Sequence, residues 1–192
     1  DSDPMDPIDL NPGGNPGHGT HVAGIIAGVG NNGTGVTGVM WTARLMALKA
    51  GGVNGALSTA AIVSAIHYGI ANGARVINAS FSAPDCSQAL YDAVSAANAA
   101  GVILVAAAGN EASDNDNLPS FPANFGSPSA CDGQQKAALP NVITVAATDE
   151  SDQLISLSNF GSTTVHVAAP GIRINSTKPT SSVTNVLLHK FD

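Results

Sequence analysis

Hydrophobic residues recur at helical spacing near the start of the chain. Val22, Ile25, Ile26 and Val29 fall on one helical face, after a run of loop residues that ends at Gly17. A helix is therefore predicted to begin near residue 18.

Two further helices are predicted from the same spacing and from their end signals. Ser58 or Thr59 caps the first, which stops at Gly73, and Ser87 caps the second, which stops at Gly101. A serine or threonine satisfies the free amides at a helix start, and glycine adopts the backbone conformation that ends a helix.

The remaining apolar stretches are predicted to be strands, at residues 39–49, 75–80, 102–108, 142–147 and 164–169. Apolar residues in these stretches come in runs and do not alternate with polar ones, most clearly at 102–108, and helices separate several of the stretches. Such a pattern is typical of a parallel sheet with helices on both faces. The sequence predicts an α/β fold of this three-layer kind.

Composition narrows the class of protein. Of the 192 residues, 44% are hydrophobic and only 11% are charged, which favours a compact chain with one sizeable core. The net charge is -7 and no basic cluster occurs, so nucleic-acid binding is disfavoured. The longest apolar runs, such as 101–108, are too short to cross a membrane. The two cysteines, Cys86 and Cys131, lie in polar stretches, and we expect a disulfide and an extracellular location.

The first predicted helix opens with a segment that can carry chemistry. Residues 17–24 read Gly-His-Gly-Thr-His-Val-Ala-Gly and place His18 in the first turn, while Gly24 and Gly28 leave room for a neighbouring backbone. An imidazole makes a good general base when a partner fixes its tautomer. A capping histidine is the simpler alternative for a lone residue, and a metal pair with His21 is a third interpretation, although no further ligand pattern follows.

Polar turns follow two of the predicted strands. Ser80-Phe81-Ser82 comes after one strand and Gly109-Asn110 after another. Ligands of parallel sheets bind outside the carboxyl ends of the strands. These turns and His18 are therefore predicted to converge on one cleft.

The segment around His18 resembles the histidine segment of the subtilisin-like serine peptidases, or subtilases. The Ala-Ala-Ala-Gly-Asn run at 106–110 and the segments at 121–123, 157–161 and 169–172 resemble subtilase segments as well. The resemblance covers most of the chain, so residues 1–178 are expected to be a partial catalytic domain with an incomplete subtilisin-like sheet. Residues 179–192 are expected to be a divergent tail or the start of an inserted module.

The resemblance implies roles for individual residues. His18 would be the general base and acid, and Asn110 would donate to the oxyanion of the transition state. The substrate would contact Asn54, Gly55, Ser80, Phe81, Ser82, Ala106, Ala107, Ala108 and Gly109. At 80–83 this chain has Ser-Phe-Ser-Ala where the family usually has two glycines, which affects the width of the pocket for the substrate side chain.

The turn-rich loop after the first helix is a candidate cation site. Such a loop can aim oxygen atoms at a hard cation, although an ordinary surface turn is the alternative. The resemblance implies structural calcium, bound by the Asn32 side chain and by the carbonyls of Gly30, Thr34 and Val36. A further carboxylate ligand would come from the chain before His18.

Two parts of the family's Asp-His-Ser triad have no counterpart in the sequence. No serine stands in the Gly-Thr-Ser-Met-Ala context of the nucleophile, and no aspartate stands in Asp-Thr-Gly or Asp-Ser-Gly. Because a triad works as a unit, the chain alone is expected to be inactive and poorly stable, as an excised part of a secreted endopeptidase. The complete enzyme is expected to be a monomer that hydrolyses polypeptides. A catalytically inactive peptide-binding protein is the alternative.

Overall fold

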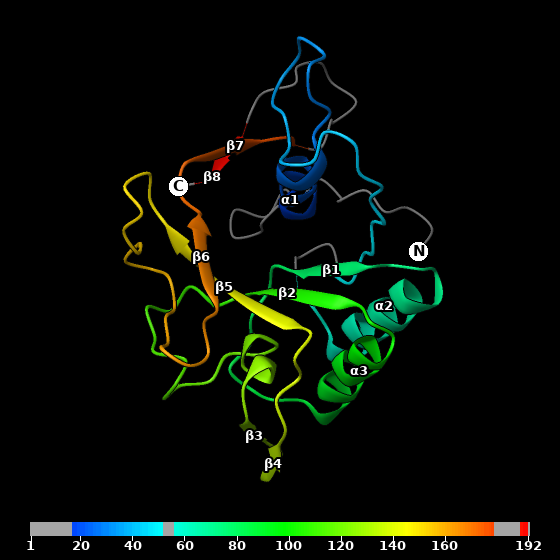
Figure 1. Ribbon diagram of the computed structural model, residues 1–192, viewed down its shortest axis with the longest axis vertical. Helices are drawn as coiled ribbons and strands as arrows, with labels where there is room; N and C mark the ends of the chain where they lie inside the picture. Colours follow the sequence, from blue (N-terminus) through cyan, green and yellow to red (C-terminus); the bar gives the residue numbers. More distant parts are fainter. Residues whose placement is uncertain (1–16, 52–55, 179–188, 192) are drawn as a thin grey trace. The chain divides into compact units, whose positions relative to one another are not determined.

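In a computed structural model, the structure describes residues 17–51, 56–178 and 189–191 (Figure 1). The chain forms two compact units. Asp1–Ala61 and Arg173–Asp192 make the first, and Ile62–Ile172 makes the second.

The second unit is built on a four-stranded parallel sheet. Its strands are β1 (Val76–Ala79), β2 (Ile103–Ala107), β5 (Val142–Thr148) and β6 (Val167–Pro170), in the order β1-β2-β5-β6. Helix α3 (Gln88–Ala99) connects β1 to β2 along the chain, and helix α2 (Thr59–Ala71) precedes β1. The predicted α/β class with a parallel sheet and helices is confirmed.

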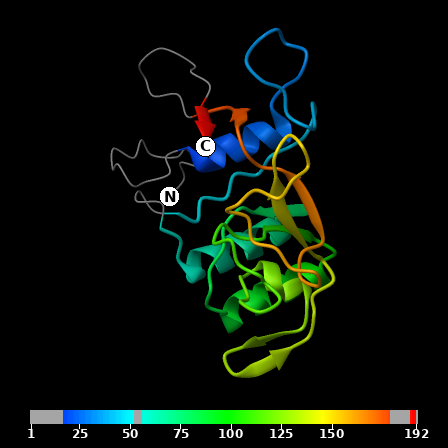
Figure 2. The same cartoon turned by 90° about the vertical axis from the view of Figure 1, so that its left-hand side faces the viewer.

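Helices α2 (Thr59–Ala71) and α3 (Gln88–Ala99) lie side by side (Figure 2). Their caps are those that the sequence predicts. The Ser58 hydroxyl accepts a hydrogen bond from a first-turn amide of α2 at 3.2 Å, and the Ser87 hydroxyl does the same for α3 at 3.4 Å. A glycine follows each helix with a positive φ, of 78° and 70°, which stops the helix.

One face of the sheet forms the core of the second unit. Helix α3 packs on β2, and the short 3-10 helix η1 (Ala123–Gly126) packs on β5. The side chains on the buried face are those of Ala79, Leu104, Ala106, Val142, Thr144 and Ala146. Phe125 of η1 is fully buried, with its ring 5.4 Å from that of Tyr91 and 5.0 Å from that of Phe121. Apolar burial on this face is the main source of stability for the unit.

A hairpin is joined covalently to the segment before α3. Strands β3 (Ser129–Cys131) and β4 (Gln134–Lys136) pair in antiparallel fashion. The structure joins Cys86 to Cys131 by a disulfide, as the two cysteines of the sequence suggest. The bond closes a loop across 45 positions of sequence.

The first unit packs a helix against a strand that comes much later in the chain. Helix α1 (His18–Ala27) contacts β7 (Ile174–Ser176), which pairs in antiparallel fashion with β8 (His189–Phe191). The Ser176 hydroxyl donates to the carbonyl of His21 at 2.6 Å. The predicted helix at residue 18 is confirmed.

Gly24 is the point where this strand comes closest to α1. A Cβ atom at Gly24 would meet the hydroxyls of Ser176 and Thr177 and would lie 3.0 Å from the Thr177 amide nitrogen. The Thr177 hydroxyl also donates to the Thr20 carbonyl at 2.8 Å. A side chain at position 24 would force the strand away, so the small residue that the sequence places there is required.

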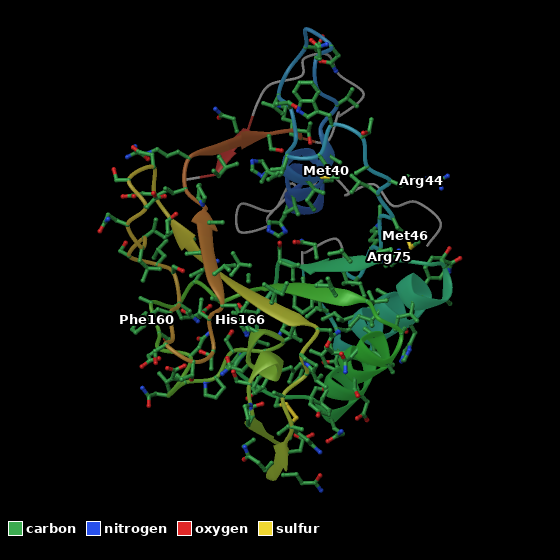
Figure 3. The ribbon with its side chains drawn as sticks, in the orientation of Figure 1. Met40, Arg44, Met46, Arg75, Phe160 and His166 are labelled. Carbon is green, nitrogen blue, oxygen red and sulfur yellow. A yellow bond between two sulfur atoms is a disulfide. The ribbon has the colours of Figure 1, made fainter. Side chains whose placement is uncertain are left out.

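The prediction of a buried strand at 39–49 is wrong. The structure has no strand there, and residues 39–47 are exposed, as Met40 and Met46 show in Figure 3. The amides of Val39 and Met40 instead bond to carbonyls in the last turns of α1, both at 2.9 Å. A strand needs a partner backbone, and within the described residues no strand pairs with this stretch. The apolar composition of residues 39–49 does not indicate whether such a partner exists.

The strand predicted at 164–169 begins later, as β6 at Val167. The amides of residues 162–164 bond to the carboxylate of Asp116, so they are not available to a strand ladder. None of the helices among the described residues is long and apolar enough to span a membrane.

Candidate active site

Two of the predicted substrate-contact segments leave the sheet at the same edge. Strands β1 and β2 are parallel neighbours, with Ala79 opposite Ala106. The turn 80–82 follows β1 and the turn 108–110 follows β2, so both lie at the carboxyl edge of the sheet. The structure thus brings together, within the second unit, two parts of the site that the sequence predicts.

The turn after β2 presents Asn110 to solvent. Gly109 has φ of 121°, a conformation that other residues rarely adopt, and the space for a Cβ there is filled by Asn159 and Glu111. Asn110 itself is exposed, and within the described residues its side chain has no hydrogen-bond partner. Its backbone amide donates to the Glu111 carboxylate at 3.0 Å. A fixed backbone therefore carries a carboxamide that is available to a ligand.

The turn after β1 is held from two sides. The Asn78 side chain donates to the Ser80 hydroxyl at 2.9 Å. Just beyond Ser82, Ala83 exchanges two backbone hydrogen bonds with Phe121, at 3.0 and 2.8 Å. The turn is fixed at both ends, while Phe81 is half-buried and Ser82 is exposed.

The alanines before Asn110 belong to the sheet. Ala106 and Ala108 are each 1% exposed, so their side chains pack in the core, and Ala107 between them is half-buried. Any contact of Ala106 or Ala108 with a substrate would be made by the backbone. Asn54 and Gly55, predicted to flank the substrate, lie outside the described residues.

His18 belongs to the first unit and Asn110 to the second. His18 is the first residue of α1, is half-buried, and follows Gly17, whose φ is 84°. The Nε2 atom of His21 lies 3.2 Å from the Ile174 carbonyl oxygen, so this histidine ties α1 to β7. Helix α1 therefore places one histidine at its open end and uses the other for packing.

The loop at 30–36 carries the predicted cation ligands. The Asn32 side-chain oxygen accepts a hydrogen bond from the Thr34 amide at 3.0 Å, and residues 31–35 are exposed. Calcium takes six to eight oxygen ligands. This loop supplies two carboxamides, a threonine hydroxyl and backbone carbonyls but no carboxylate, so it can make only part of such a site. The described residues contain no group of three or more His, Cys, Asp and Glu side chains suited to a metal ion.

Sequence reasoning missed the residues that hold the Asn110 turn. Asn159 and Asn115 are 1% and 0% exposed, and both donate to the Ala108 carbonyl, at 3.2 and 2.8 Å. Asn159 lies in a segment that resembles the family, but spacing along the chain does not reveal which turn its side chain reaches. Asn159 and Ala108 are 51 positions apart, so no local pattern links the two residues.

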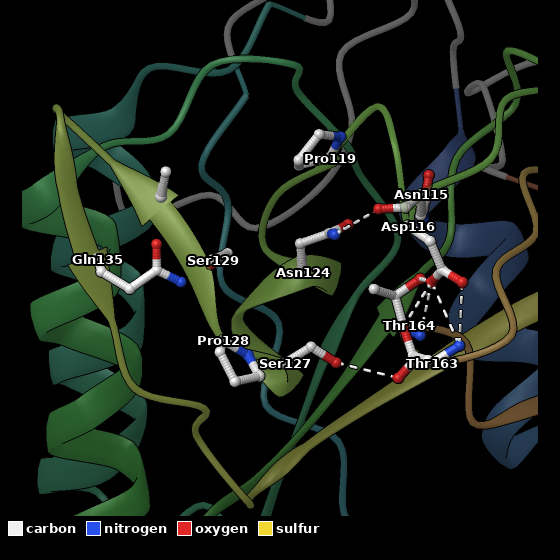
Figure 4. Close-up of a pocket in the computed structure, with 11 residues that line it drawn as sticks. Asn115, Asp116, Pro119, Asn124, Ser127, Pro128, Ser129, Gln135, Thr163 and Thr164 are labelled. Atoms are coloured by element: carbon white, nitrogen blue, oxygen red, sulfur yellow. Dashed lines mark hydrogen bonds between the residues drawn. The ribbon is translucent and has the colours of Figure 1, made fainter.

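A separate hollow of about 480 Å³ opens in the second unit beside the β3–β4 hairpin (Figure 4). Asp116 is at its wall and accepts hydrogen bonds from the amides and hydroxyls of Ser162, Thr163 and Thr164, at 2.8 to 3.2 Å. The hydroxyl of Thr164 is the main cause that holds the pKa of Asp116 well below its ordinary value of 3.8, followed by the hydroxyl of Ser162. Asp116 acts as an anchor for residues 162–164.

Replacing Asp116 with asparagine is expected to lower the melting temperature at pH 7. The folded-state pKa is depressed, so the stabilising contribution of the carboxylate is complete above the unfolded value of 3.8 and is lost progressively as the pH falls from there towards the folded-state pKa. The difference in melting temperature between wild type and D116N should therefore shrink between pH 5 and pH 3. The exposed Asp85, replaced in D85N, is the control. A difference that grows on acidification would contradict this prediction.

Comparison with known proteins places the chain in a family. The model of the subtilase family matches residues 3–190. A thermophilic serine proteinase of Bacillus sp. (strain AK1) is 40% identical over 172 residues, which are 90% of this chain and 37% of that protein. Subtilisin DY of Bacillus licheniformis is 39% identical over 171 residues, 88% of this chain and 57% of that protein. Thermitase of Thermoactinomyces vulgaris is 37% identical over 174 residues, 91% of this chain and 56% of that protein.

The chain spans between 37% and 57% of the length of these three relatives. The family model covers nearly all of its residues, and the predicted histidine, alanine and asparagine segments all lie within the matched range. The resemblance seen in the sequence is thereby confirmed, and the chain belongs to the subtilase family of subtilisin-like serine peptidases.

Proposed function

We propose that this chain supplies part of the active site of a serine endopeptidase, with His18 as the general base and acid and Asn110 as the oxyanion donor. The observation that carries this proposal is the exposed Asn110 carboxamide on a fixed turn at the carboxyl edge of the sheet. Membership of the subtilase family supports the choice of reaction. The substrate would be a polypeptide.

Each residue has a chemical task in this proposal. The half-buried imidazole of His18 would take the proton from a nucleophilic hydroxyl and return it to the leaving amine. The Asn110 side chain would donate to the carbonyl oxygen as negative charge develops on it. The turn at 80–82 would lie along the substrate backbone, and residues 106–109 would form a wall of the pocket for the substrate side chain.

We also propose that the 192 residues alone do not hydrolyse peptides. The sequence offers His18 and Asn110 but no Gly-Thr-Ser-Met-Ala segment for the nucleophile and no Asp-Thr-Gly or Asp-Ser-Gly segment for the orienting carboxylate. Those two groups would have to come from polypeptide outside these residues. Without a nucleophile, only binding and oxyanion stabilisation remain.

The proposal is tested by separating binding from turnover. The purified chain is titrated with a tetrapeptide that ends in a free carboxylate, whose oxygen resembles the oxyanion, while the amide signals of residues 80–82 and 108–110 are followed by NMR. We expect these signals to shift, and N110A to weaken binding while the exposed control N117A does not. Fluorogenic peptides should show no turnover. Signals that stay unchanged in both turns would contradict the proposed site, and hydrolysis blocked by a serine-directed reagent would contradict the proposed inactivity.

A catalytically inactive peptide-binding protein is the second candidate. The exposed Asn110 carboxamide on its fixed turn supports peptide binding with or without a nucleophile. The two candidates differ in the coding sequence on either side. Asp-Ser-Gly or Asp-Thr-Gly upstream and Gly-Thr-Ser downstream would support the peptidase, and their absence would support the binding protein.

We further propose an extracellular location and a calcium ion at the loop 30–36. The disulfide supports the location, because such bonds persist in oxidising compartments. The oxygen atoms of Asn32 and of the carbonyls of Gly30, Thr34 and Val36 suit a hard cation, with further oxygen ligands from elsewhere. Removing calcium with a chelator should lower the melting temperature of the wild type but not of N32A. An equal melting temperature with and without chelator would remove calcium from the proposal.

A further inference from the structure

The carboxamide of Asn159 makes hydrogen bonds with almost every part of the turn that carries Asn110. Its oxygen accepts from the amides of Glu111 and Ser113, at 2.8 and 3.1 Å. Its nitrogen donates to the Ala108 carbonyl at 3.2 Å, to the Glu111 carboxylate at 2.9 Å and to the Asn115 side-chain oxygen at 3.1 Å. The whole side chain is used in this way although the residue is only 1% exposed.

The backbone of Asn159 adds a further contact to the same turn. Its amide donates to the Gly109 carbonyl at 2.9 Å. The Glu111 carboxylate that receives the Asn159 side chain also accepts from the Asn110 amide, at 3.0 Å. A chain of hydrogen bonds therefore runs from the buried Asn159 through Glu111 to the backbone of Asn110.

We propose that Asn159 is a positioning residue for Asn110. Its buried carboxamide, acting with Glu111, fixes the turn at 108–113 so that the Asn110 side chain is held at the carboxyl edge of the sheet. The contacts of Asn159 are sufficient to support its role in holding the turn. The role of Asn110 as an oxyanion donor rests on the function proposed above.

The substitution N159D tests the proposal because it keeps the shape of the side chain and removes its hydrogen-bond donor. The hydrogen bond to Glu111 depends on that donor. In N159D both oxygens accept, so the donor to Glu111, to the Ala108 carbonyl and to the Asn115 side chain is lost, and two carboxylates face each other. Among the charged groups, only Glu111 is in hydrogen-bond contact with Asn159 within the described residues. The two carboxylates can share one proton at low pH but repel at neutral pH.

The experiment measures amide hydrogen exchange across the turn. At pH 7, N159D should raise the exchange rate of the Asn110 amide, corrected for intrinsic exchange, by about tenfold or more relative to wild type. The increase should diminish at pH 4 to 5, where the shared proton restores a donor. It should also diminish in N159D/E111Q at pH 7, because the neutral carboxamide introduced at position 111 removes the repulsion between the two carboxylates. Its nitrogen can donate to the carboxylate introduced at position 159 while its oxygen accepts from the Asn110 amide. N72D, which adds the same charge at an exposed position just after α2, is the control.

Each outcome decides the matter. A local increase that acidification and E111Q both reverse supports the positioning role. Exchange at Asn110 equal to wild type overturns it, and so does a uniform increase across the second unit that neither condition reverses, because that would be general destabilisation. If N159D does not fold at pH 7, folding of N159D/E111Q at that pH would support the proposal in the same way. If neither variant folds at pH 7, the proposal is overturned.

The peptide titration separates this inference from the proposed function. If wild type binds the tetrapeptide, N159D should bind it about tenfold more weakly at pH 7, and N159D/E111Q should recover most of the affinity. If wild type does not bind the peptide, the proposed function fails while the exchange data still judge the positioning role. Equal binding by wild type and N159D, with altered exchange, would overturn the link between the turn and the ligand.

Discussion

Breaking the Cys86–Cys131 disulfide is expected to lower the free energy of unfolding by about 2–4 kcal/mol. The bond closes a loop across 45 positions, and in the chain-entropy treatment a loop of that length is worth about 4 kcal/mol at 25 °C. Relaxation of the native state and residual structure in the unfolded state reduce this value. Denaturant unfolding with and without a reducing agent measures the change.

C86S provides the matched control for reduction. It removes the cross-link and leaves Cys131, which is 1% exposed, as a buried thiol instead of burying a new hydroxyl. Reduced wild type and C86S should therefore unfold at the same denaturant concentration, and the reducing agent should not change C86S. An unfolding midpoint of wild type that is unaffected by reduction would show that the bond does not stabilise the folded chain.

Replacing Phe125 with alanine is expected to cost about 3–5 kcal/mol of stability. Phe125 is fully buried on η1, and its ring contacts those of Tyr91 and Phe121. Truncation removes apolar contact and leaves a cavity between η1 and its neighbours that these rings can fill only in part. The measurement is the free energy of unfolding by denaturant.

F160A is the matched control for this change. Phe160 is 44% exposed and points away from the sheet (Figure 3), so its loss should cost less than about 1 kcal/mol. A loss in F125A no greater than that in F160A would show that η1 does not hold the core together.

The sequence was sufficient for elements whose signals are local. The serine caps and terminal glycines of α2 and α3 act on the adjacent turn. The strands β1 and β2 are marked by apolar runs next to those helices, and β5 by an apolar run of its own. The run at 39–49 has the same composition, yet a strand also requires a backbone partner, which composition does not reveal. The result was a predicted strand where the structure has exposed backbone.

Only those parts of the site that are marked by a local sequence motif could be predicted. Gly109 and Asn110 are marked by a polar turn after an apolar strand, so their place at the edge of the sheet followed from the sequence. Asn159 contacts that turn from 48 to 51 positions away, and nothing in its own segment indicates which turn it meets. Side chains that support a site from a distant segment need coordinates to be found.

The contact between α1 and β7 constrains the order in which the protein is assembled on the ribosome. His21 and Ile174 are 153 positions apart, and the entire second unit lies between them. During synthesis α1 leaves the exit tunnel before residues 174–177, so its hydrogen bonds with Ile174, Ser176 and Thr177 can form only after the second unit has been synthesised. Docking of α1 on β7 therefore follows the synthesis of the second unit instead of preceding it.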